Sequence, residues 1–243
     1  MTQPPGRLES LSMFFPFHNE EENIVSVLEE AIEVGLGVTD SLEIIAVNDG
    51  STDRTLERAE SVRVRYPEMV RIISFENNRG YGAAVKSGLE SSTNAWIFFS
   101  DGDRQFRLSD ISKLIELTGS GSEKLLAIGY RINREDSFIR RLNAALFNAA
   151  MRMILGISGV RDIDCAFKLI PGEAIQAIPP LTSEGAMISA ELLARCSRAG
   201  FTSRETGVQH YPRLFGKQSG ARLSVIFKAF IEMFACLRSI RSE

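Results

Sequence analysis

The chain has 243 residues, of which 44% are hydrophobic, and this length suffices for one sizeable hydrophobic core. Its net charge of −3 argues against a nucleic-acid partner, because binding to phosphate backbones relies on an excess of Lys and Arg. The charge is unevenly spread: residues 1–125 hold 12 basic and 21 acidic side chains, whereas residues 126–243 hold 16 basic and 10 acidic ones. An acidic half suits a cation and a basic half suits an anionic partner, although scattered surface charges can give the same split.

The three cysteines, Cys165, Cys196 and Cys236, are widely spaced and lack a CxxC pair, which favours neither a disulfide framework nor a zinc site. This usage fits a reducing cytoplasm. The apolar run 11–17 is too short and too interrupted for a signal peptide. No uncharged apolar stretch reaches the roughly 18 residues that a spanning helix needs. We therefore expect a cytoplasmic protein whose chain, as given, does not cross a membrane.

Short apolar runs bounded by polar turn residues predict four buried strands, at 11–15, 42–47, 69–75 and 95–100. Between these runs, apolar residues recur at helical spacing over 21–34, 52–64 and 81–91. The alternation of strands and helices predicts a parallel sheet with right-handed crossovers. In such sheets ligands bind beyond the carboxyl ends of the strands, so the loops after the strands are the first places to seek a site.

The second half is less regular, with predicted strands at 125–130 and 166–170 and predicted helices at 138–155 and 184–199. The last stretch, 222–240, places apolar residues on one helical face, with cations nearby. Packing on the core would produce the same stripe, and the three phenylalanines beside cations slightly favour a membrane-surface helix. We accordingly divide the chain into a catalytic domain over 1–220 and an amphipathic helix over 221–243.

Polar loops follow the first two predicted strands: residues 16–20 read Pro-Phe-His-Asn-Glu and residues 48–53 read Asn-Asp-Gly-Ser-Thr-Asp. Ser51 or Thr52 can cap the following helix, so that part of the second loop needs no function. Asp49 stands directly at the predicted strand end. A carboxylate there could accept hydrogen bonds from a base or a ribose.

The loop after the third strand, 77–84, is rich in glycine and opens a helix, which permits a phosphate cradle. As a dinucleotide fingerprint it is weak, because Val85 stands where the third glycine is expected. The glycines can equally let the loop turn and the helix pack closely on the sheet. Both interpretations stay open at this stage.

Asp101, Gly102 and Asp103 directly follow the fourth strand. An Asp-Gly pair can signal a hairpin, but residues 104–110 are too polar to form the returning strand. Two carboxylates flanking a glycine suit a hard cation, since Mg²⁺ and Mn²⁺ take oxygen ligands from one or two carboxylates plus substrate phosphates. Such a cation would offset charge on a diphosphate leaving group.

Together these motifs resemble the family 2 inverting glycosyltransferases with a GT-A fold, and most closely the dolichyl- or polyprenyl-phosphate mannosyl- or glucosyltransferase branch. Segments 16–20, 47–53 and 101–105 are similar to that family's PxxNE, VDDGSxD and DxDxQ motifs, with His18 in place of the usual Tyr and Asn48 in place of the first acid. Segments 129–131, 162–168 and 210–219 resemble its acceptor-arginine segment, its D-x-x-(S/C)-(G/A)-F segment and its mobile loop over the diphosphate.

The resemblance implies an α/β, Rossmann-like GT-A domain whose central, mostly parallel sheet is flanked by helices and followed by a C-terminal amphipathic helix. It implies a metal-dependent hexosyltransferase with a GDP-mannose or UDP-sugar donor, Mg²⁺ or Mn²⁺ as cofactor, and a polyprenyl phosphate acceptor met at the cytoplasmic membrane surface. The implied donor-binding residues are Pro16, His18, Glu20, Val47, Asp49, Gly80, Asp101, Gly102, Asp103, Arg213 and Lys217. The implied metal residues are Asp101, Asp103 and Gln105, the acceptor residues are Arg131, Arg140 and Arg141, and the catalytic residues are Asp101, Asp103 and Asp164.

Several alternatives remain open. Asp164 is either catalytic or a buried, hydrogen-bonded acid that holds the next strand. Glu191, inside an apolar helical run, is better interpreted as a structural partner for a nearby arginine. For the whole chain, a sugar hydroxyl of a polysaccharide or glycolipid is the alternative acceptor, which would require a general base. A catalytically silent nucleotide-binding or scaffold module is the alternative outside the enzymes.

Overall fold

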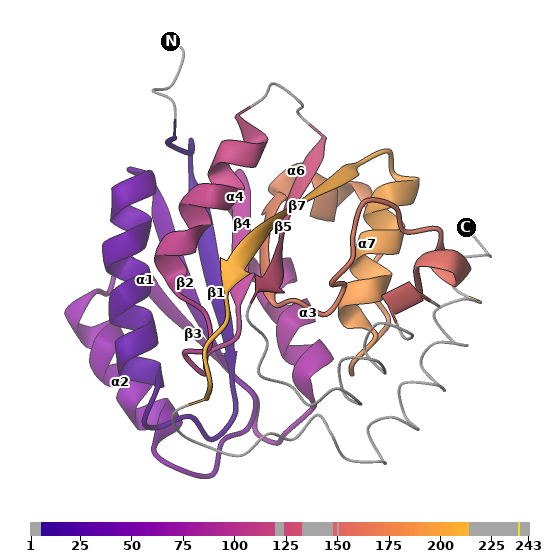
Figure 1. Cartoon of the computed structure of the whole chain (residues 1–243). Coiled ribbons are helices and arrows are strands. Elements are labelled where there is room, and N and C mark those ends of the chain that lie inside the picture. Colours follow the sequence, from indigo (N-terminus) through magenta and orange to yellow (C-terminus); the bar gives the residue numbers. More distant parts are fainter. Residues whose placement is uncertain (1–5, 120–123, 133–147, 150, 214–237, 239–243) are drawn as a thin grey trace.

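The structure is a computed structural model, and it describes residues 6–119, 124–132, 148–149, 151–213 and 238. These residues form one seven-stranded sheet with helices on both faces (Figure 1). The strands are β1 (Leu11–Phe17), β2 (Leu42–Asn48), β3 (Val70–Ser74), β4 (Trp96–Ser100), β5 (Leu125–Ile132), β6 (Phe167–Pro171) and β7 (Thr202–Gln209). The helices are α1 (Ile24–Val38), α2 (Thr55–Arg65), α3 (Tyr81–Ser91), the 3₁₀ turn η1 (Leu108–Asp110), α4 (Ile111–Thr118), α6 (Gly172–Ala177) and α7 (Ile188–Arg198).

The strand order in the sheet is β3-β2-β1-β4-β6-β5-β7. Strands β1 to β4 pair in parallel, as do β5 and β7, whereas β6 runs antiparallel to both of its neighbours. The mostly parallel sheet predicted from the sequence is therefore confirmed. Because β6 is reversed, the segment before it reaches the same edge of the sheet as the loops that follow the other strands. That edge gathers the candidate site residues.

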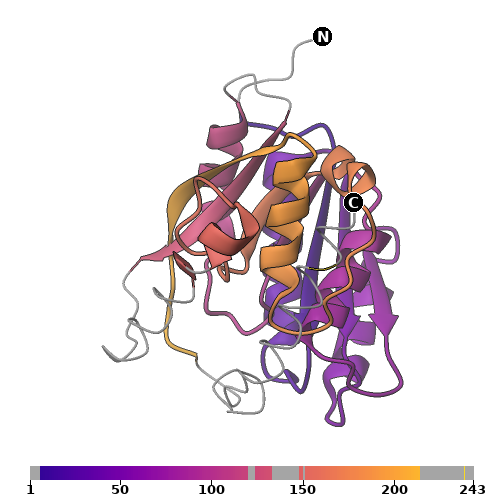
Figure 2. The same ribbon diagram turned by 90° about the vertical axis from the view of Figure 1, so that its right-hand side faces the viewer.

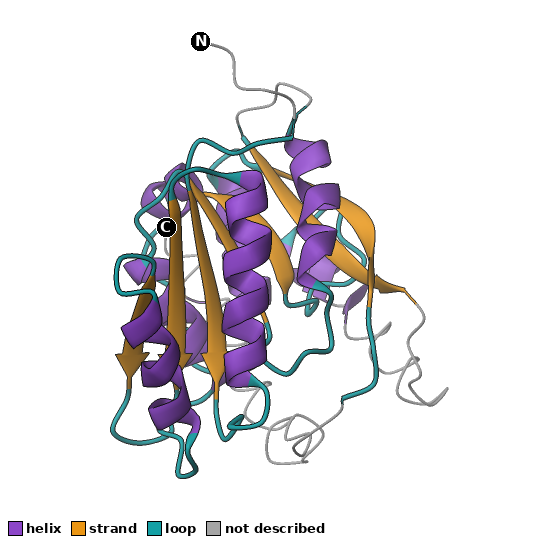
Figure 3. Ribbon diagram, turned by 90° about the vertical axis from the view of Figure 1, so that its left-hand side faces the viewer, coloured by secondary structure: helices purple, strands orange, loops and turns teal. Residues whose placement is uncertain are grey.

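The helices lie in two layers. Contacts join α1 with α2 and with η1, and η1 with α4, on one face, while α7 contacts α3 and α6 on the other (Figure 2, Figure 3). Apolar residues at helical spacing explain this packing: Val27, Leu28 and Ala31 of α1 are buried on the sheet. Beneath the site, phenylalanine rings of neighbouring strands stack, with 5.1 Å between the centroids of Phe14 and Phe99.

The predicted elements of the first half are confirmed within a few residues, and α3 begins and ends where its periodicity places it. Four elements of the described part of the chain were missed, namely η1, α4, α6 and β7. Strand β7 is polar and only partly buried, so neither an apolar run nor regular alternation marks it. The predicted helix 138–155 lies mostly outside the described residues, and the predicted helix 222–240 and the boundary at 220 lie outside them apart from residue 238. None of the helices in the described part of the chain is long and apolar enough to cross a membrane.

Candidate active site

Hydrogen bonds connect the loop after β1 to the loop after β2. Asn19, which has a positive φ of 55°, accepts the main-chain N–H of Thr52 at 2.8 Å, and its own N–H donates to Ser51 at 3.0 Å. The Asp49 carbonyl lies 2.8 Å from Nδ1 of His18. These contacts place the exposed His18 ring at the open edge of the sheet, where the sequence predicts a donor-binding group.

Asp49 is buried, and its carboxylate binds the glycine-rich loop. One oxygen accepts the main-chain N–H of Arg79 at 2.7 Å, and the other accepts that of Gly80 at 3.0 Å. Gly80 has a φ of 101°, a conformation that side-chain-bearing residues rarely adopt, which explains the glycine. Asp49 therefore has a structural function that the sequence did not reveal, and its contact with a nucleoside stays a prediction.

The remaining donor positions on β1 and β2 differ in exposure. Val47 is fully buried, so its side chain contributes to the core, whereas Pro16 is partly buried near the end of β1. Glu20 is largely buried, and its carboxylate accepts a hydrogen bond from the Asn23 amide at 2.6 Å. The donor roles predicted for Pro16, Val47 and Glu20 are not tested by this geometry.

The carboxylate pair Asp101 and Asp103 stands at the end of β4, as predicted. Gly102 between them packs on the core, because a Cβ there would lie 2.2 Å from Cε1 of Phe17. Burial and the charge of Asp101 raise the pKa of Asp103 to about 7, and burial raises the pKa of Asp101. Two crowded, desolvated carboxylates of this kind create a local excess of negative charge.

Tyr81 is a site residue that the sequence reasoning missed. Its hydroxyl interacts with the Asp101 carboxylate and favours the charged form of that carboxylate, although the residue as a whole is 39% exposed. Burial of the hydroxyl and the charge of Asp101 raise the pKa of Tyr81 well above its usual value, and Asp164 and Asp103 add to this effect. Its position as the first helical residue after the glycine-rich loop, at the carboxyl edge of the sheet, was the available signal.

The segment after β7 returns across the carboxylate pair. The main-chain N–H of Tyr211 donates to the Gln105 carbonyl at 2.8 Å, and the side-chain amide of Gln105 donates to the Tyr211 carbonyl at 3.0 Å. Arg213 forms an ion pair with Glu20, and its Nη1 lies 3.6 Å from Oδ2 of Asp103. Gln105 thus holds this segment in place, and its predicted role as a metal residue stays a prediction.

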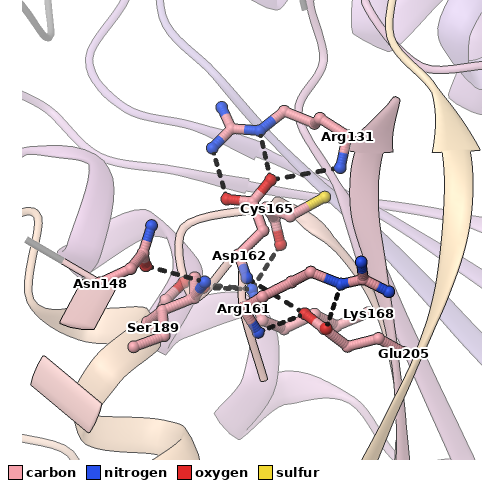
Figure 4. Close-up of polar contacts among 9 residues, drawn as sticks. Arg131, Asn148, Arg161, Asp162, Cys165, Lys168, Ser189 and Glu205 are labelled. Atoms are coloured by element: carbon pink, nitrogen blue, oxygen red, sulfur yellow. Dashed lines mark hydrogen bonds and ion pairs between the residues drawn. The ribbon is translucent and has the colours of Figure 1, made fainter. Parts of the chain in front are cut away.

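Across the site, Arg131 at the end of β5 is paired with Asp162. Its Nε and Nη2 lie 2.8 and 2.7 Å from the two carboxylate oxygens (Figure 4). Although burial alone lowers the pKa of Arg131, the hydrogen bonds and charge of Asp162 raise it above its usual value. Asp164 is exposed, so the interpretation of Asp164 as a buried acid is wrong, and the buried, hydrogen-bonded acid of this segment is Asp162.

The carboxylate pair fits a divalent cation. Among the described residues no group of three or more His, Cys, Asp or Glu side chains forms a closed metal site. Two carboxylates that leave further positions to substrate oxygens are nevertheless the arrangement that Mg²⁺ and Mn²⁺ take with phosphates. Burial raises the pKa of both carboxyls, and the charge of Asp101 adds to the shift of Asp103; a cation held by the pair would offset both effects. Arg140, Arg141 and Lys217 lie outside the described residues.

The fold and this edge of the sheet define a class, the GT-A glycosyltransferases. Solved structures with the same architecture include glucosyl-3-phosphoglycerate synthase from Mycobacterium tuberculosis in complex with Mn²⁺, uridine diphosphate and glucosyl-3-phosphoglycerate. That structure matches with a TM-score of 0.67 and 21% identity, covering 96% of this chain and 77% of its own. The GT-A fold predicted from the sequence is confirmed.

The chain belongs to glycosyl transferase family 2, whose family model matches residues 12–177. A dodecaprenyl-phosphate galacturonate synthase from Rhizobium johnstonii is 27% identical over 243 residues, covering 99% of this chain and 70% of that protein. A dolichyl-phosphate beta-glucosyltransferase from Saccharomyces cerevisiae is 34% identical over 205 residues, covering 75% of this chain and 61% of the yeast protein. The predicted family is confirmed, and the chain spans only part of the length of these relatives.

Proposed function

We propose that the chain is an inverting, metal-dependent glycosyltransferase that transfers a hexose from a nucleotide-diphosphate sugar to a polyprenyl phosphate. The observation that carries the proposal is the placement of two kinds of group at one edge of the sheet. The carboxylates of the partly buried Asp101 and the buried Asp103 lie on one side, and the oriented guanidinium of Arg131 lies within electrostatic reach of Asp101. The names of the relatives from Rhizobium johnstonii and yeast support a polyprenyl phosphate acceptor.

A cation held by Asp101 and Asp103 would supply positive charge beside the donor diphosphate. Arg213, which lies against Glu20 and Asp103, is placed to bind diphosphate oxygens in exchange for these carboxylates. Arg131 would bind the acceptor phosphate, whose oxygens suit a planar fork of N–H donors. The acceptor phosphate is already ionised near neutral pH, so its oxygen can attack the anomeric carbon without a strong base. The bond between that carbon and the donor diphosphate breaks in the same step, and the nucleoside diphosphate leaves.

The proposal is tested with labelled GDP- and UDP-sugars, polyprenyl phosphate, and Mg²⁺ or Mn²⁺. We expect label in the lipid extract with one donor, and its loss with chelator. Label that stays water-soluble with every donor would contradict the lipid acceptor. The same panel identifies the base and the sugar of the donor.

A sugar hydroxyl acceptor is the second candidate, and the exposure of Asp164 favours it. A hydroxyl must lose a proton as it attacks, and an exposed carboxylate near Tyr81 and Arg131 could act as the base. Transfer to a glycan without lipid phosphate, abolished in Asp164→Asn, would establish this candidate.

We expect Tyr81→Phe to weaken binding of Mn²⁺ together with the nucleoside diphosphate by about 10-fold, because the Asp101 carboxylate loses the polar interaction with the Tyr81 hydroxyl that favours its charged form. Isothermal titration calorimetry measures this without turnover. Tyr66→Phe, at the end of α2 and remote from the site, is the matched control and should bind as wild type does. Equal affinities for all three proteins would show that the Tyr81 hydroxyl does not support the metal site.

We expect Arg140→Ala to raise the KM for polyprenyl phosphate by about 10-fold through loss of a charge-assisted contact with the phosphate. The KM for the donor should hold. Titration of polyprenyl phosphate at saturating donor measures the effect, and an acceptor titration curve equal to that of wild type would show that Arg140 does not bind the acceptor.

Contact of residues 221–243 with the cytoplasmic membrane surface is part of the same proposal. It is tested by measuring the binding of a chain truncated at residue 221 to anionic vesicles.

A further inference from the structure

Residues 161–165, which we call the aspartate loop, are held by polar side chains from separate parts of the chain. Glu205 of β7 accepts the main-chain N–H groups of Arg161 at 2.9 Å and of Asp162 at 3.1 Å. Asn148 accepts the N–H of Ile163 at 3.1 Å. Lys168 of β6 donates from below to the carbonyls of Ile163 and Cys165 (Figure 4).

Two of these supporting groups are polar side chains that are themselves buried. Lys168 is fully buried and Asn148 is 4% exposed, and burial lowers the pKa of the Lys168 ammonium. Burying an ammonium opposes folding unless its hydrogen bonds compensate, and an apolar side chain of similar length would pack there without that penalty. Stability alone therefore does not account for Lys168. Its effect is to fix the path of the aspartate loop.

The aspartate loop presents Asp162 to Arg131. Both carboxylate oxygens of Asp162 accept hydrogen bonds from Arg131. Oδ1 accepts one from Nη2 at 2.7 Å, and Oδ2 accepts one from Nε at 2.8 Å and one from the main-chain N–H at 3.2 Å. A guanidinium has five N–H donors, of which this side-on pairing uses two. The remaining three donors, one on Nη2 and two on Nη1, make no hydrogen bond within the described part of the chain and can serve a further partner. The Arg131 side chain is 18% exposed, whereas that of Asp162 is 9% exposed.

We propose that Asp162 is a positioning residue, which holds the Arg131 guanidinium in one orientation so that its remaining N–H donors form a fork for the phosphate of the acceptor. This inference rests on the proposed function. An arginine already held in one rotamer loses less conformational entropy when a phosphate binds, and its fork is already planar and oriented. Asp162 therefore acts on acceptor binding through Arg131, without touching the acceptor itself.

The test is a double-mutant cycle on the KM for polyprenyl phosphate at saturating donor, with wild type, Asp162→Asn, Arg131→Ala and the double variant. Asn keeps the shape of Asp162 but turns an N–H toward the guanidinium, so we expect the acceptor KM of Asp162→Asn to rise about 10-fold. The donor KM should stay at the wild-type value. The double variant should be no worse than Arg131→Ala alone, because Asp162 has nothing left to position.

Arg161→Ala is the matched control in the same loop. The Arg161 side chain is 63% exposed and pairs with Glu205, whereas the main-chain N–H groups that Glu205 accepts are kept in the variant. Its acceptor KM should equal that of wild type. A rise as large as that of Asp162→Asn would show that any disturbance of the loop has this effect, and would overturn the proposal.

The proposal would also be overturned if the effects of Asp162→Asn and Arg131→Ala on the acceptor KM simply added in the double variant, since this would show that Asp162 acts independently of Arg131. If Asp162→Asn does not fold, Arg131→Lys takes its place: the charge is kept but the fork is lost, and an acceptor KM equal to wild type would overturn the proposal. Absence of lipid product from the wild-type protein would contradict the proposed function and this inference together. Lipid product from wild type with additive losses would contradict the inference alone.

Discussion

Asp103→Asn is expected to lower kcat/KM for transfer by at least about 100-fold while the protein stays folded. A neutral amide is a poorer ligand for a hard cation, and charge stabilisation by such a cation is worth several kcal/mol, with each 1.4 kcal/mol a factor of about ten in rate. The melting temperature should change little, because the change removes a buried carboxylate that the charge of Asp101 repels. Steady-state transfer at saturating metal, together with thermal melting, measures both quantities.

Asp40→Asn is the matched control for this substitution. Asp40 pairs with Arg7 at the far edge of the molecule, and its side chain is 97% exposed. Its transfer rate should equal that of wild type. Wild-type turnover by Asp103→Asn under saturating donor and metal would show that this carboxylate does not hold a catalytic cation.

The sequence predicted the first half of the fold well because two regular patterns coincide there. Buried parallel strands appear as short apolar runs, and the helices between them show a 3.6-residue period. The ends of these strands then place Asp101 and Asp103 at one edge, and the structure finds them there. This part of the site follows from local patterns and one topological rule.

The second half was harder because tertiary contacts outweigh local pattern there. Strand β7 contains Arg204, Glu205 and Thr206, and it is a strand because it lies along β5 at the edge of the sheet. The reversal of β6 is likewise absent from the local sequence. That reversal is what carries the segment before β6 to the site.

Side-chain roles were predicted less well than side-chain positions. Asp49 binds two main-chain N–H groups of a loop that is about thirty residues further along the chain, and no local spacing reveals that approach. The burial of Asp162 and the exposure of Asp164 also depend on how Glu205 and Asn148 hold the main chain. The prediction for Glu191 is confirmed: Nε of Arg195 lies 2.9 Å from Oε1 of Glu191, and both side chains are buried.

Glu191→Ala is expected to lower the free energy of unfolding by about 3–5 kcal/mol, because it breaks the buried ion pair between Glu191 and Arg195 by removing one of the two charges. The change also removes the acceptor for the main-chain N–H groups of Thr182 at 2.9 Å and Ser183 at 2.7 Å. For a domain of this size the melting temperature should fall by about 6–20 °C. Chemical and thermal denaturation measure the two quantities.

The effect of Glu191→Ala should reach the donor site. Residues 182–183, which Glu191 holds, lead directly into Glu184, whose carbonyl accepts the N–H of Ala83 at 3.1 Å. A Cβ at Gly82 would lie 2.4 Å from the main chain of Glu184, so this segment packs tightly against the start of α3. We therefore expect the donor KM to rise even at temperatures where Glu191→Ala is fully folded.

The pH dependence of unfolding separates the charge of Glu191 from its shape. Although burial alone raises the pKa of this carboxyl, hydrogen bonds from Ser183 and Thr182 hold the pKa below its usual value in the folded protein. A lowered folded-state pKa contributes stability above the unfolded value, about 4.3, and this contribution is lost as the pH falls through the folded value. The difference in unfolding free energy between wild type and Glu191→Gln should therefore be largest near neutral pH and should shrink in acid.

Glu60→Ala, which breaks a half-exposed pair with Arg63 on α2, should change the free energy of unfolding by no more than about 0.5 kcal/mol at any pH. A pH-independent difference, or a loss in Glu191→Ala no larger than in Glu60→Ala, would show that the buried Glu191–Arg195 pair does not hold the segment behind the glycine-rich loop.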